Sequence, residues 1–326
     1  MRVLITGVAG FIGYHLAARL LAEGHEVTGL DNLSSYYDVG LKKARLHELK
    51  SRFGFDAAIS DITGRDSLDR MFVAARPDVV IHLAAQAGVR YSLTNPEAYV
   101  ASNLVGFANM LEVCRKYPPR HLLYASSSSV YGNAARLPLR ESDSTDRPLS
   151  IYAATKKANE AMAHSYSHLF AMPATGLRFF TVYGEWGRPD MAFFSFARAM
   201  LSNQPITVYN DGNMSRDFTY VGDAVESVAR LMDQPPIASE GRAPSAIVNI
   251  ASGRRVPILD FIAALESALG KTADKRYAEM QPGDVTETWA DTAKLTALTG
   301  FAPQTGIDQG IARFADWYKS WHRPAC

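Results

Sequence analysis

The sequence is poor in cysteine and contains no long apolar run. Its 326 residues include two cysteines, Cys114 and Cys326, which do not suggest a disulfide framework. A segment that crosses a bilayer needs about 20 consecutive apolar residues, and the sequence has no such run. The chain opens with Met1-Arg2-Val3 and not with a basic and then apolar leader, so we expect a cytoplasmic protein without a membrane partner.

The chain also lacks an excess of charge of either sign. Lysine and arginine number 34, and aspartate and glutamate 33, which gives a formal net charge of +1. This balance argues against a general affinity for nucleic acid or for anionic membranes. Any anion that the protein binds is therefore expected to meet a few placed cations. Hydrophobic residues make up 47% of the chain, which is ample for a large buried core.

Short apolar runs alternate with longer amphipathic stretches in the first half of the chain. Strands are expected at residues 3–5, 25–30, 57–60, 79–84, 121–125 and 175–179, and helices at residues 11–23, 67–74, 97–116 and 152–170. This alternation predicts an α/β protein with a Rossmann-type, doubly wound parallel sheet. Pro and Gly interrupt the second half at residues 184–189, 204–212 and 234–245, which is typical of a smaller C-terminal lobe with loops over a site.

Glycines occupy the junction between the first strand and the first helix. Gly7, Gly10 and Gly13 belong to the turn Gly7-Val8-Ala9-Gly10-Phe11-Ile12-Gly13. A helix N-terminus offers unpaired N–H groups and a positive dipole end to a diphosphate, and glycine lets the backbone approach it closely. We therefore expect this turn, including Phe11 and Ile12, to contact a dinucleotide.

Acidic residues follow the second and third strands. Asp31 and Asn32 end the second strand, and Asp31 lies 18 residues after Gly13. A carboxylate in this place accepts both hydroxyls of an adenosine ribose and repels a 2′-phosphate, which favours NAD over NADP. Asp61 and Ile62 are candidates to hold the adenine edge, and a helix cap is an equally good interpretation of Asp61.

The NAD-binding pattern suggests a division of the chain. We expect residues 1–175 to form the NAD-binding domain, with later return segments near residues 217–232 and 246–252. Residues 176–326 would then form mainly the substrate-binding lobe.

The segment Tyr152-Ala153-Ala154-Thr155-Lys156 supplies the candidate catalytic centre. Tyr152 and Lys156 are four residues apart and so share one face of a helix. A neighbouring ammonium and a nicotinamide cation are expected to lower the pKa of the phenol from its ordinary value of about 10. Ser127, Ser128 and Ser129 follow the fifth strand, at the carboxyl edge of the sheet, where such folds bind ligands.

These segments resemble the extended short-chain dehydrogenase/reductase superfamily. The G-x-x-G-x-x-G spacing matches, His82-Leu83-Ala84-Ala85-Gln86 resembles a cofactor-lining segment, and Asn103 matches a structural asparagine. Ser127, Tyr152 and Lys156 match the catalytic triad. The resemblance implies that Tyr152 removes a proton from a sugar hydroxyl while the carbon passes hydride to NAD⁺, and that Ser127 hydrogen-bonds the same oxygen.

Nearly the whole chain resembles the UDP-glucuronate 4-epimerases. The distinctive segments are Tyr36-Tyr37-Asp38 and Trp186-Gly187-Arg188-Pro189-Asp190-Met191, and residues 41–46, 87–92, 216–220 and 281–285 add to them. The resemblance implies C4 epimerisation of UDP-glucuronate to UDP-galacturonate through a 4-keto intermediate. In this scheme Tyr152 is the general base and NAD remains bound as a prosthetic group.

The same resemblance implies a set of substrate contacts. It places Arg188 and Arg216 near the diphosphate, Asp284 at the uridine ribose, the backbone of Val208 and Tyr209 at the uracil, and Met191 along the site. Arg90 is a further candidate to bind an anion. For each arginine, an ordinary ion pair is the alternative interpretation.

Oxidation of glucuronate at C4 produces a β-keto acid, which tends to lose CO₂. Decarboxylating relatives carry a glutamate within the segment that here contains Ser127, Ser128 and Ser129. We hypothesise that Ser128, Ser129 and Thr181 hold the carboxylate with its C–C bond out of alignment with the carbonyl π system. That orientation would suppress loss of CO₂.

Other functions stay open from the sequence. The alternatives are a UDP-glucose or UDP-N-acetylhexosamine 4-epimerase, a UDP-glucuronate decarboxylase, and a non-enzymatic NAD-binding protein, against which the presence of Tyr152 and Lys156 argues. No metal site is expected. The apolar faces of helices 97–116 and 152–170 suggest a homodimer by resemblance to related enzymes.

Overall fold

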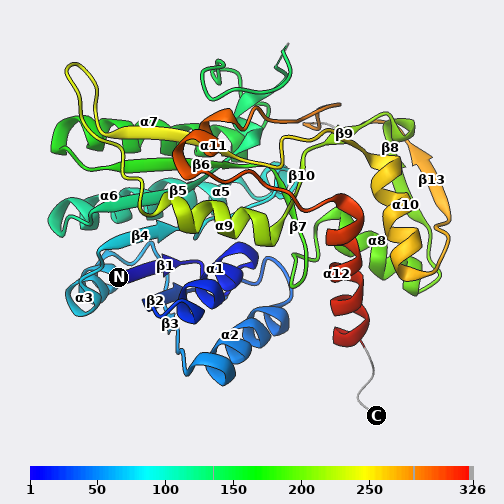
Figure 1. Cartoon of the computed structure of the whole chain (residues 1–326), viewed down its shortest axis with the longest axis horizontal. Coiled ribbons are helices and arrows are strands. Elements are labelled where there is room, and N and C mark those ends of the chain that lie inside the picture. The colour runs from blue at the N-terminus through cyan, green and yellow to red at the C-terminus, as the bar shows by residue number, and fades with distance from the viewer. Residues whose placement is uncertain (135, 282, 323–326) are drawn as a thin grey trace.

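The computed structural model describes residues 1–134, 136–281 and 283–322. Pro282 and Cys326 lie outside the described residues. The described chain is built on a seven-stranded sheet in the order β11-β6-β5-β4-β1-β2-β3, in which every neighbouring pair is parallel (Figure 1). Its strands are β1 (Arg2–Thr6), β2 (Glu26–Asp31), β3 (Ala58–Ile59), β4 (Val79–His82), β5 (His121–Ser127), β6 (Ala174–Phe179) and β11 (Ser245–Ile250).

Helices cover both faces of this sheet, which explains why its strands are continuous apolar runs. In β4, for example, Val79, Val80 and Ile81 are all fully buried, as expected for a parallel strand between two helical layers. One core joins the sheet to α1 (Phe11–Ala22), α2 (Val39–Phe53) and α9 (Val221–Leu231). A second core joins it to α3 (Arg65–Ala75), α6 (Gly106–Lys116) and α7 (Ile151–Phe170). The predicted doubly wound α/β fold is confirmed.

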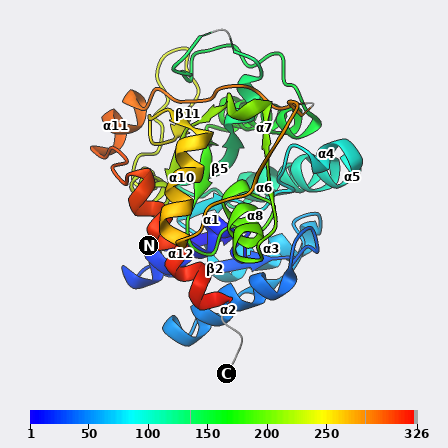
Figure 2. The ribbon, with the colours of Figure 1, turned by 90° about the vertical axis from the view of Figure 1, so that its right-hand side faces the viewer.

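A smaller lobe, on the right of Figure 1, is built from segments between β6 and β11 and from segments that follow β11. The lobe contains β7 (Thr181–Tyr183), α8 (Ala192–Leu201), β8 (Ile206–Tyr209), η3 (Asn210–Gly212), β9 (Ser215–Arg216), β10 (Phe218–Tyr220), β12 (Val256–Pro257), α10 (Ile258–Leu269), β13 (Lys275–Ala278) and α12 (Ile307–Trp321). The rings of Phe218 and Phe261 stack with their centroids 4.3 Å apart. Figure 2 shows α10 beside α12, and α11 (Ala293–Thr299) packs near α9 and β11.

The predicted helix at residues 97–116 has a different internal structure. After the short α4 (Tyr91–Thr94), the chain runs through α5 (Pro96–Tyr99), the π-helical segment η1 (Val100–Val105) and α6. Asn103 lies in η1, accepts a hydrogen bond from the Gln86 N–H and donates to the Gln86 carbonyl and to Thr155 Oγ1. The wide helical turn therefore directs an amide into the segment that follows β4.

Candidate active site

The carboxyl ends of the central strands surround a cavity of about 460 Å³. This is the edge at which parallel sheets of this type bind ligands. Most of the predicted site residues line this cavity, and they are Gly7, Gly10, Phe11, Ile12, Gly13, Asp31, Asn32, Ile62, Leu83, Ala84, Ala85, Ser127, Ser128, Ser129, Tyr152, Lys156, Thr181, Arg188, Met191, Arg216 and Asp284.

The glycine turn leaves no room for side chains. A Cβ added to Gly13 would lie 2.1 Å from the Gly7 carbonyl oxygen, and one added to Gly10 would lie 2.9 Å from the same atom. Gly7 has a φ of +74°, which favours glycine. Gly10 caps α1 without a side-chain hydrogen bond, so the helix N-terminus presents backbone N–H groups to the cavity. This cradle fits the diphosphate of a dinucleotide.

Asp31 is held in place by the backbone on both sides of it. Its carboxylate accepts hydrogen bonds from the Ala9 N–H at 3.1 Å and the Leu33 N–H at 2.8 Å. The side chain is only 6% exposed, yet it borders the cavity. A carboxylate fixed beside the glycine turn in this way fits the ribose of NAD.

Asp61 does not line the cavity, although its neighbours Ser60 and Ile62 do. Its carboxylate accepts hydrogen bonds from Asn32 Nδ2 at 2.7 Å and from the Thr63 N–H at 2.8 Å. The side chain therefore fixes the two loops that follow β2 and β3.

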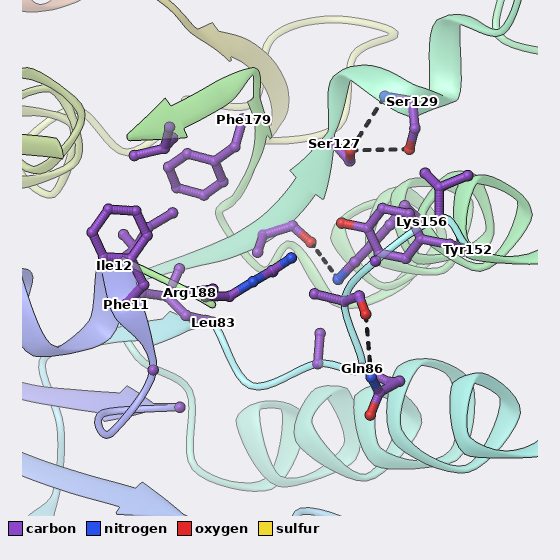
Figure 3. A pocket seen from close by; sticks show the side chains of 18 of the residues that line it. Phe11, Ile12, Leu83, Gln86, Ser127, Ser129, Tyr152, Lys156, Phe179 and Arg188 are labelled. Atoms are coloured by element: carbon purple, nitrogen blue, oxygen red, sulfur yellow. Dashed lines mark hydrogen bonds between the residues drawn. The ribbon is translucent and has the colours of Figure 1, made fainter. Parts of the chain in front are cut away.

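Tyr152 and Lys156 project side by side from the first turns of α7 toward Ser127 (Figure 3). The helix starts here because Ser150 caps it, with its hydroxyl accepting from the Ala153 N–H. Lys156 Nζ donates to the Ala125 carbonyl in β5 at 3.0 Å. The ammonium thus joins α7 to the strand that ends in Ser127.

The protonation of this pair differs from the sequence expectation. Burial raises the pKa of Tyr152, although a hydrogen bond to Ser127 and the charge of Arg188 act in the opposite direction. Burial also lowers the pKa of Lys156 to about 8. The expected lowering of the phenol pKa by Lys156 is therefore absent in the chain alone, because desolvation dominates and the ammonium faces Ala125. The nicotinamide cation, on which the expectation also depended, is not part of the chain.

Ser127 is the last residue of β5, and Ser128 and Ser129 begin the short turn η2 (Ser128–Tyr131) directly after it. The Ser127 hydroxyl accepts from the Ser129 N–H at 3.2 Å and from the Ser129 hydroxyl at 2.9 Å. It is thus oriented by the residue two positions later. Behind the turn, Ser126 Oγ donates to Glu160, and Glu160 forms a buried ion pair with Arg178 at 2.8 Å.

Two of the predicted cations, Arg188 and Arg216, line the same cavity. Arg188 forms a bidentate pair with Asp190, whose Oδ2 also accepts a hydrogen bond from the Tyr36 hydroxyl at 3.1 Å. Arg216 borders the cavity and donates to the backbone carbonyls of Ser215 and Thr286. These guanidinium groups are placed cations of the kind that the near-neutral net charge led us to expect.

Some predicted residues lie next to the cavity and not on its surface. Arg90 pairs with Asp284 at 3.2 Å and stacks over the Tyr209 ring at 5.2 Å. Val208 is buried in β8, and Asn103 supports Gln86 from behind. The cavity surface does not include Arg90, Val208, Tyr209, Asn103 or Asp61.

The cavity lining also includes residues that the sequence did not assign to the site, among them Tyr36, Lys42, Phe179 and Phe180, and it includes Gln86 from the predicted cofactor-lining segment. Phe179 ends β6 just as Ser127 ends β5, so the rule that placed the serines would also have found it. Tyr36 and Lys42 lie in two segments, Tyr36-Tyr37-Asp38 and residues 41–46, for which the sequence offers a family resemblance and no specific role.

Among the described residues, no group of three or more His, Cys, Asp or Glu side chains is arranged to hold a metal ion. Within the same described residues, every helix is too short or too polar to span a bilayer.

Known proteins resemble this chain over almost its whole length. The model of the NAD dependent epimerase/dehydratase family matches residues 3–251. A probable UDP-glucuronate 4-epimerase from Rhizobium meliloti is 49% identical, and the match covers 100% of this chain and 99% of the relative.

Solved structures agree with this result. UDP-glucuronic acid 4-epimerase from Bacillus cereus, in complex with UDP-glucuronic acid and NAD, is 33% identical with a TM-score of 0.90, covering 99% of this chain and 100% of its own. Thermus thermophilus UDP-glucose 4-epimerase, in complex with NAD, is 31% identical with a TM-score of 0.85, covering 98% and 99%. The resemblance inferred from the sequence is confirmed, and the chain belongs to the NAD dependent epimerase/dehydratase family.

Proposed function

We propose that this protein is an NAD-dependent UDP-glucuronate 4-epimerase, which interconverts UDP-glucuronate and UDP-galacturonate. The observation that carries the proposal is the position of Tyr152, Lys156 and Ser127 in the same cavity as the glycine turn and Asp31. The full-length match to a UDP-glucuronic acid 4-epimerase that was crystallised with its substrate and NAD supports the choice of substrate.

The proposed chemistry needs a base and a binding pocket from the chain. When bound, NAD⁺ accepts hydride from C4 of the sugar and later returns it to the opposite face. Tyr152 takes the proton from the C4 hydroxyl as the 4-keto sugar forms, and gives it back on reduction. Ser127 hydrogen-bonds the same oxygen, and its hydrogen bond to Tyr152 together with the charge of Arg188 favours the phenolate. Lys156 holds α7 against β5 through its hydrogen bond to the Ala125 carbonyl. Proton and hydride are both restored, so the reaction consumes no cofactor.

We assign the remaining cavity residues by the chemistry that they offer. The glycine turn with Phe11 and Ile12, Asp31 and Asn32, Ile62, and the segment Leu83–Ala85 would hold NAD, with Asp61 and Asn103 fixing the loops behind them. Arg188 and Arg216 would bind the UDP diphosphate, Asp284 the uridine ribose, Val208 and Tyr209 the uracil through their backbone, and Met191 and Arg90 would border that site. The division into an NAD-binding domain and a substrate lobe follows from this assignment.

The proposal is tested by the product that the purified enzyme forms without added cofactor. We expect NMR to detect UDP-galacturonate from UDP-glucuronate, and Tyr152→Phe to lose this activity while keeping NAD. UDP-glucose and UDP-N-acetylglucosamine are assayed in parallel, because a UDP-glucose 4-epimerase is also among the similar structures. Faster turnover of either neutral sugar, or a pentose product, would replace the proposed substrate or reaction.

We also propose that the protein works as a homodimer in the cytoplasm. Val100 and Val105 in η1, and Leu169 and Phe170 in α7, are each more than two-fifths exposed, so both helices offer apolar side chains to a partner. The free thiol of Cys114 is consistent with a reducing compartment. Light scattering should show a dimer that Val105→Glu dissociates, whereas Val73→Glu, at another exposed valine, leaves it intact. A monomeric wild type would refute the dimer.

A further inference from the structure

Arg45 is a fully buried arginine that borders both lobes of the molecule. Its side chain, in α2, is 0% exposed and forms no salt bridge within the described residues. A buried charge is costly unless hydrogen bonds and nearby charges compensate it. The free-energy cost of burying the Arg45 guanidinium must therefore be offset by its hydrogen bonds.

The hydrogen bonds of Arg45 join two segments of the cavity wall. Nη1 donates to the Ala9 carbonyl in the glycine turn at 2.8 Å and to the Tyr37 hydroxyl at 2.8 Å. Nε donates to the Trp186 carbonyl at 3.1 Å, and Nη2 donates to the Trp186 and Gly187 carbonyls. Only a planar group with five donors can serve these acceptors together.

The two joined segments carry the two halves of the proposed site. Ala9 also donates its N–H to Asp31, the candidate ribose ligand. Gly187 immediately precedes Arg188, the candidate substrate ligand. A continuous series of bonds thus runs from Asp31 through Ala9 and Arg45 to the residue before Arg188.

The backbone at the far end of this series needs support. Trp186 has a left-handed φ of +57°, which is unfavourable for a residue other than glycine. Its ring packs against Tyr14, Trp317 and Trp321, at centroid distances of 5.5, 5.2 and 4.9 Å. The aromatic rings hold the side chain, and Arg45 holds the carbonyl.

We propose that Arg45 is a positioning residue that fixes Arg188 relative to the glycine turn, and so keeps substrate and NAD in register. This inference rests on the proposed epimerase function. An epimerase must turn its keto intermediate and reduce it again at the same nicotinamide. Register between the two sites therefore matters more here than for a dehydrogenase that releases its product. When Arg45 is lost, the intermediate is expected to escape and to leave reduced cofactor on the enzyme.

The test compares Arg45→Met and Arg45→Lys with the wild-type holoenzyme. Leu111→Ala is the control, because it opens a cavity in the core on the other face of the sheet and destabilises the fold without touching the site. For Arg45→Met we expect kcat for UDP-glucuronate to fall about a hundredfold, the scale for a misplacement of roughly 1 Å, with a smaller change in KM. Reduced cofactor should accumulate, as seen by its near-ultraviolet absorbance.

Two readouts separate positioning from general destabilisation. Hydrogen exchange of residues 184–191 should become faster in both Arg45 variants and stay unchanged in Leu111→Ala. Arg45→Lys keeps the charge but loses the planar set of five donors, so we expect it to retain NAD while its kcat stays as low as that of Arg45→Met. If Arg45→Met does not fold, Arg45→Lys decides the question alone.

The proposal is overturned if the Arg45 variants lose only thermal stability, as Leu111→Ala does, or if lysine restores kcat fully. The wild type is assayed first. Failure of the wild type to epimerise UDP-glucuronate would refute the proposed function alone, since hydrogen exchange and NAD content would still report on the role of Arg45.

Discussion

The hydroxyl of Tyr36 donates a hydrogen bond to Asp190 at 3.1 Å, although the two residues are 154 positions apart in the sequence. Tyr36 belongs to the loop that follows β2, and Asp190 to the loop that precedes α8. The Tyr36 ring packs against Tyr91 at 4.8 Å, and Asp190 also holds Arg188. The Asp190 carboxylate therefore links Tyr36, in the loop after β2, to Arg188, in the loop before α8. Tyr36 and Arg188 both line the cavity.

Tyr36→Phe is expected to weaken the retention of NAD. It removes one hydrogen bond to a charged group, which typically contributes roughly 1.5–3 kcal/mol, so we expect NAD to dissociate about tenfold faster. The measurement is the NAD content of the protein during prolonged dialysis. Tyr91→Phe is the matched control, because its hydroxyl accepts from Asn95 outside the cavity. Equal NAD loss from both variants would contradict a role for the Tyr36–Asp190 bond.

Gly13→Ala is expected to abolish NAD binding, because the new Cβ would lie 2.1 Å from the Gly7 carbonyl oxygen and would deform the turn. Gly306→Ala provides the comparison, since no atom of the described residues lies within 4 Å of a Cβ at that helix start. We expect the first variant to purify without NAD and the second to keep wild-type NAD content and turnover. NAD bound at full occupancy by Gly13→Ala would show that the turn is not the diphosphate site.

The parts of this fold that the sequence predicts are those with a strong local pattern. The apolar runs of β4 and β5 mark buried parallel strands, and the spacing of Gly7, Gly10 and Gly13 marks the turn between β1 and α1. Tyr152 and Lys156 are four residues apart, so helical geometry alone brings them together. These features need no information from distant segments.

The remainder depends on contacts between distant segments. Arg45 meets Gly187 across 142 positions, and no local pattern distinguishes a buried arginine from a solvated one. Helix α2 is rich in lysine and arginine and buries few apolar side chains, so its position follows from packing and not from an apolar stripe. The sequence also predicted a lowered pKa for Tyr152, whereas burial raises it. Desolvation depends on the assembled cavity and has no local sequence pattern.

The buried ammonium of Lys156 should make stability depend on alkaline pH. Its pKa is lowered from 10.5 to about 8 by burial. Between these values the unfolded chain holds a proton that the folded chain has lost, so the free energy of unfolding rises as pH increases through this window. Below about pH 8 both states carry the proton, and the cost of burying the charge is fully present.

The rise is expected to be about 3 kcal/mol, since one pKa unit corresponds to about 1.4 kcal/mol. Denaturant unfolding of NAD-depleted protein at several pH values measures it. Lys156→Met serves as the reference, because subtracting its curve removes the contributions of all other titrating groups. A wild-type curve parallel to that of Lys156→Met from pH 8 to about pH 10.5 would mean that Lys156 is not the titrating group.

The hydroxyls of Ser128 and Thr181 are predicted to control whether the intermediate loses CO₂. Both residues line the cavity that Ser127 also lines, and Ser129 Oγ already donates a hydrogen bond to Ser127. If these hydroxyls hold the carboxylate away from the π axis of the C4 carbonyl, their removal lets the C–C bond rotate into alignment. The pentose fraction of the product should then rise, while Tyr152 still supports oxidation at C4.

Thr181→Val and Ser128→Ala test this prediction, and Thr181→Ser is the matched control that keeps the hydroxyl. We expect the ratio of UDP-pentose to UDP-galacturonate, read by NMR, to increase about tenfold or more in the first two, because a lost hydrogen bond to a carboxylate corresponds to roughly 1.5–3 kcal/mol. Thr181→Ser should stay near the wild-type ratio. An unchanged ratio in both hydroxyl-free variants would contradict this role of Ser128 and Thr181.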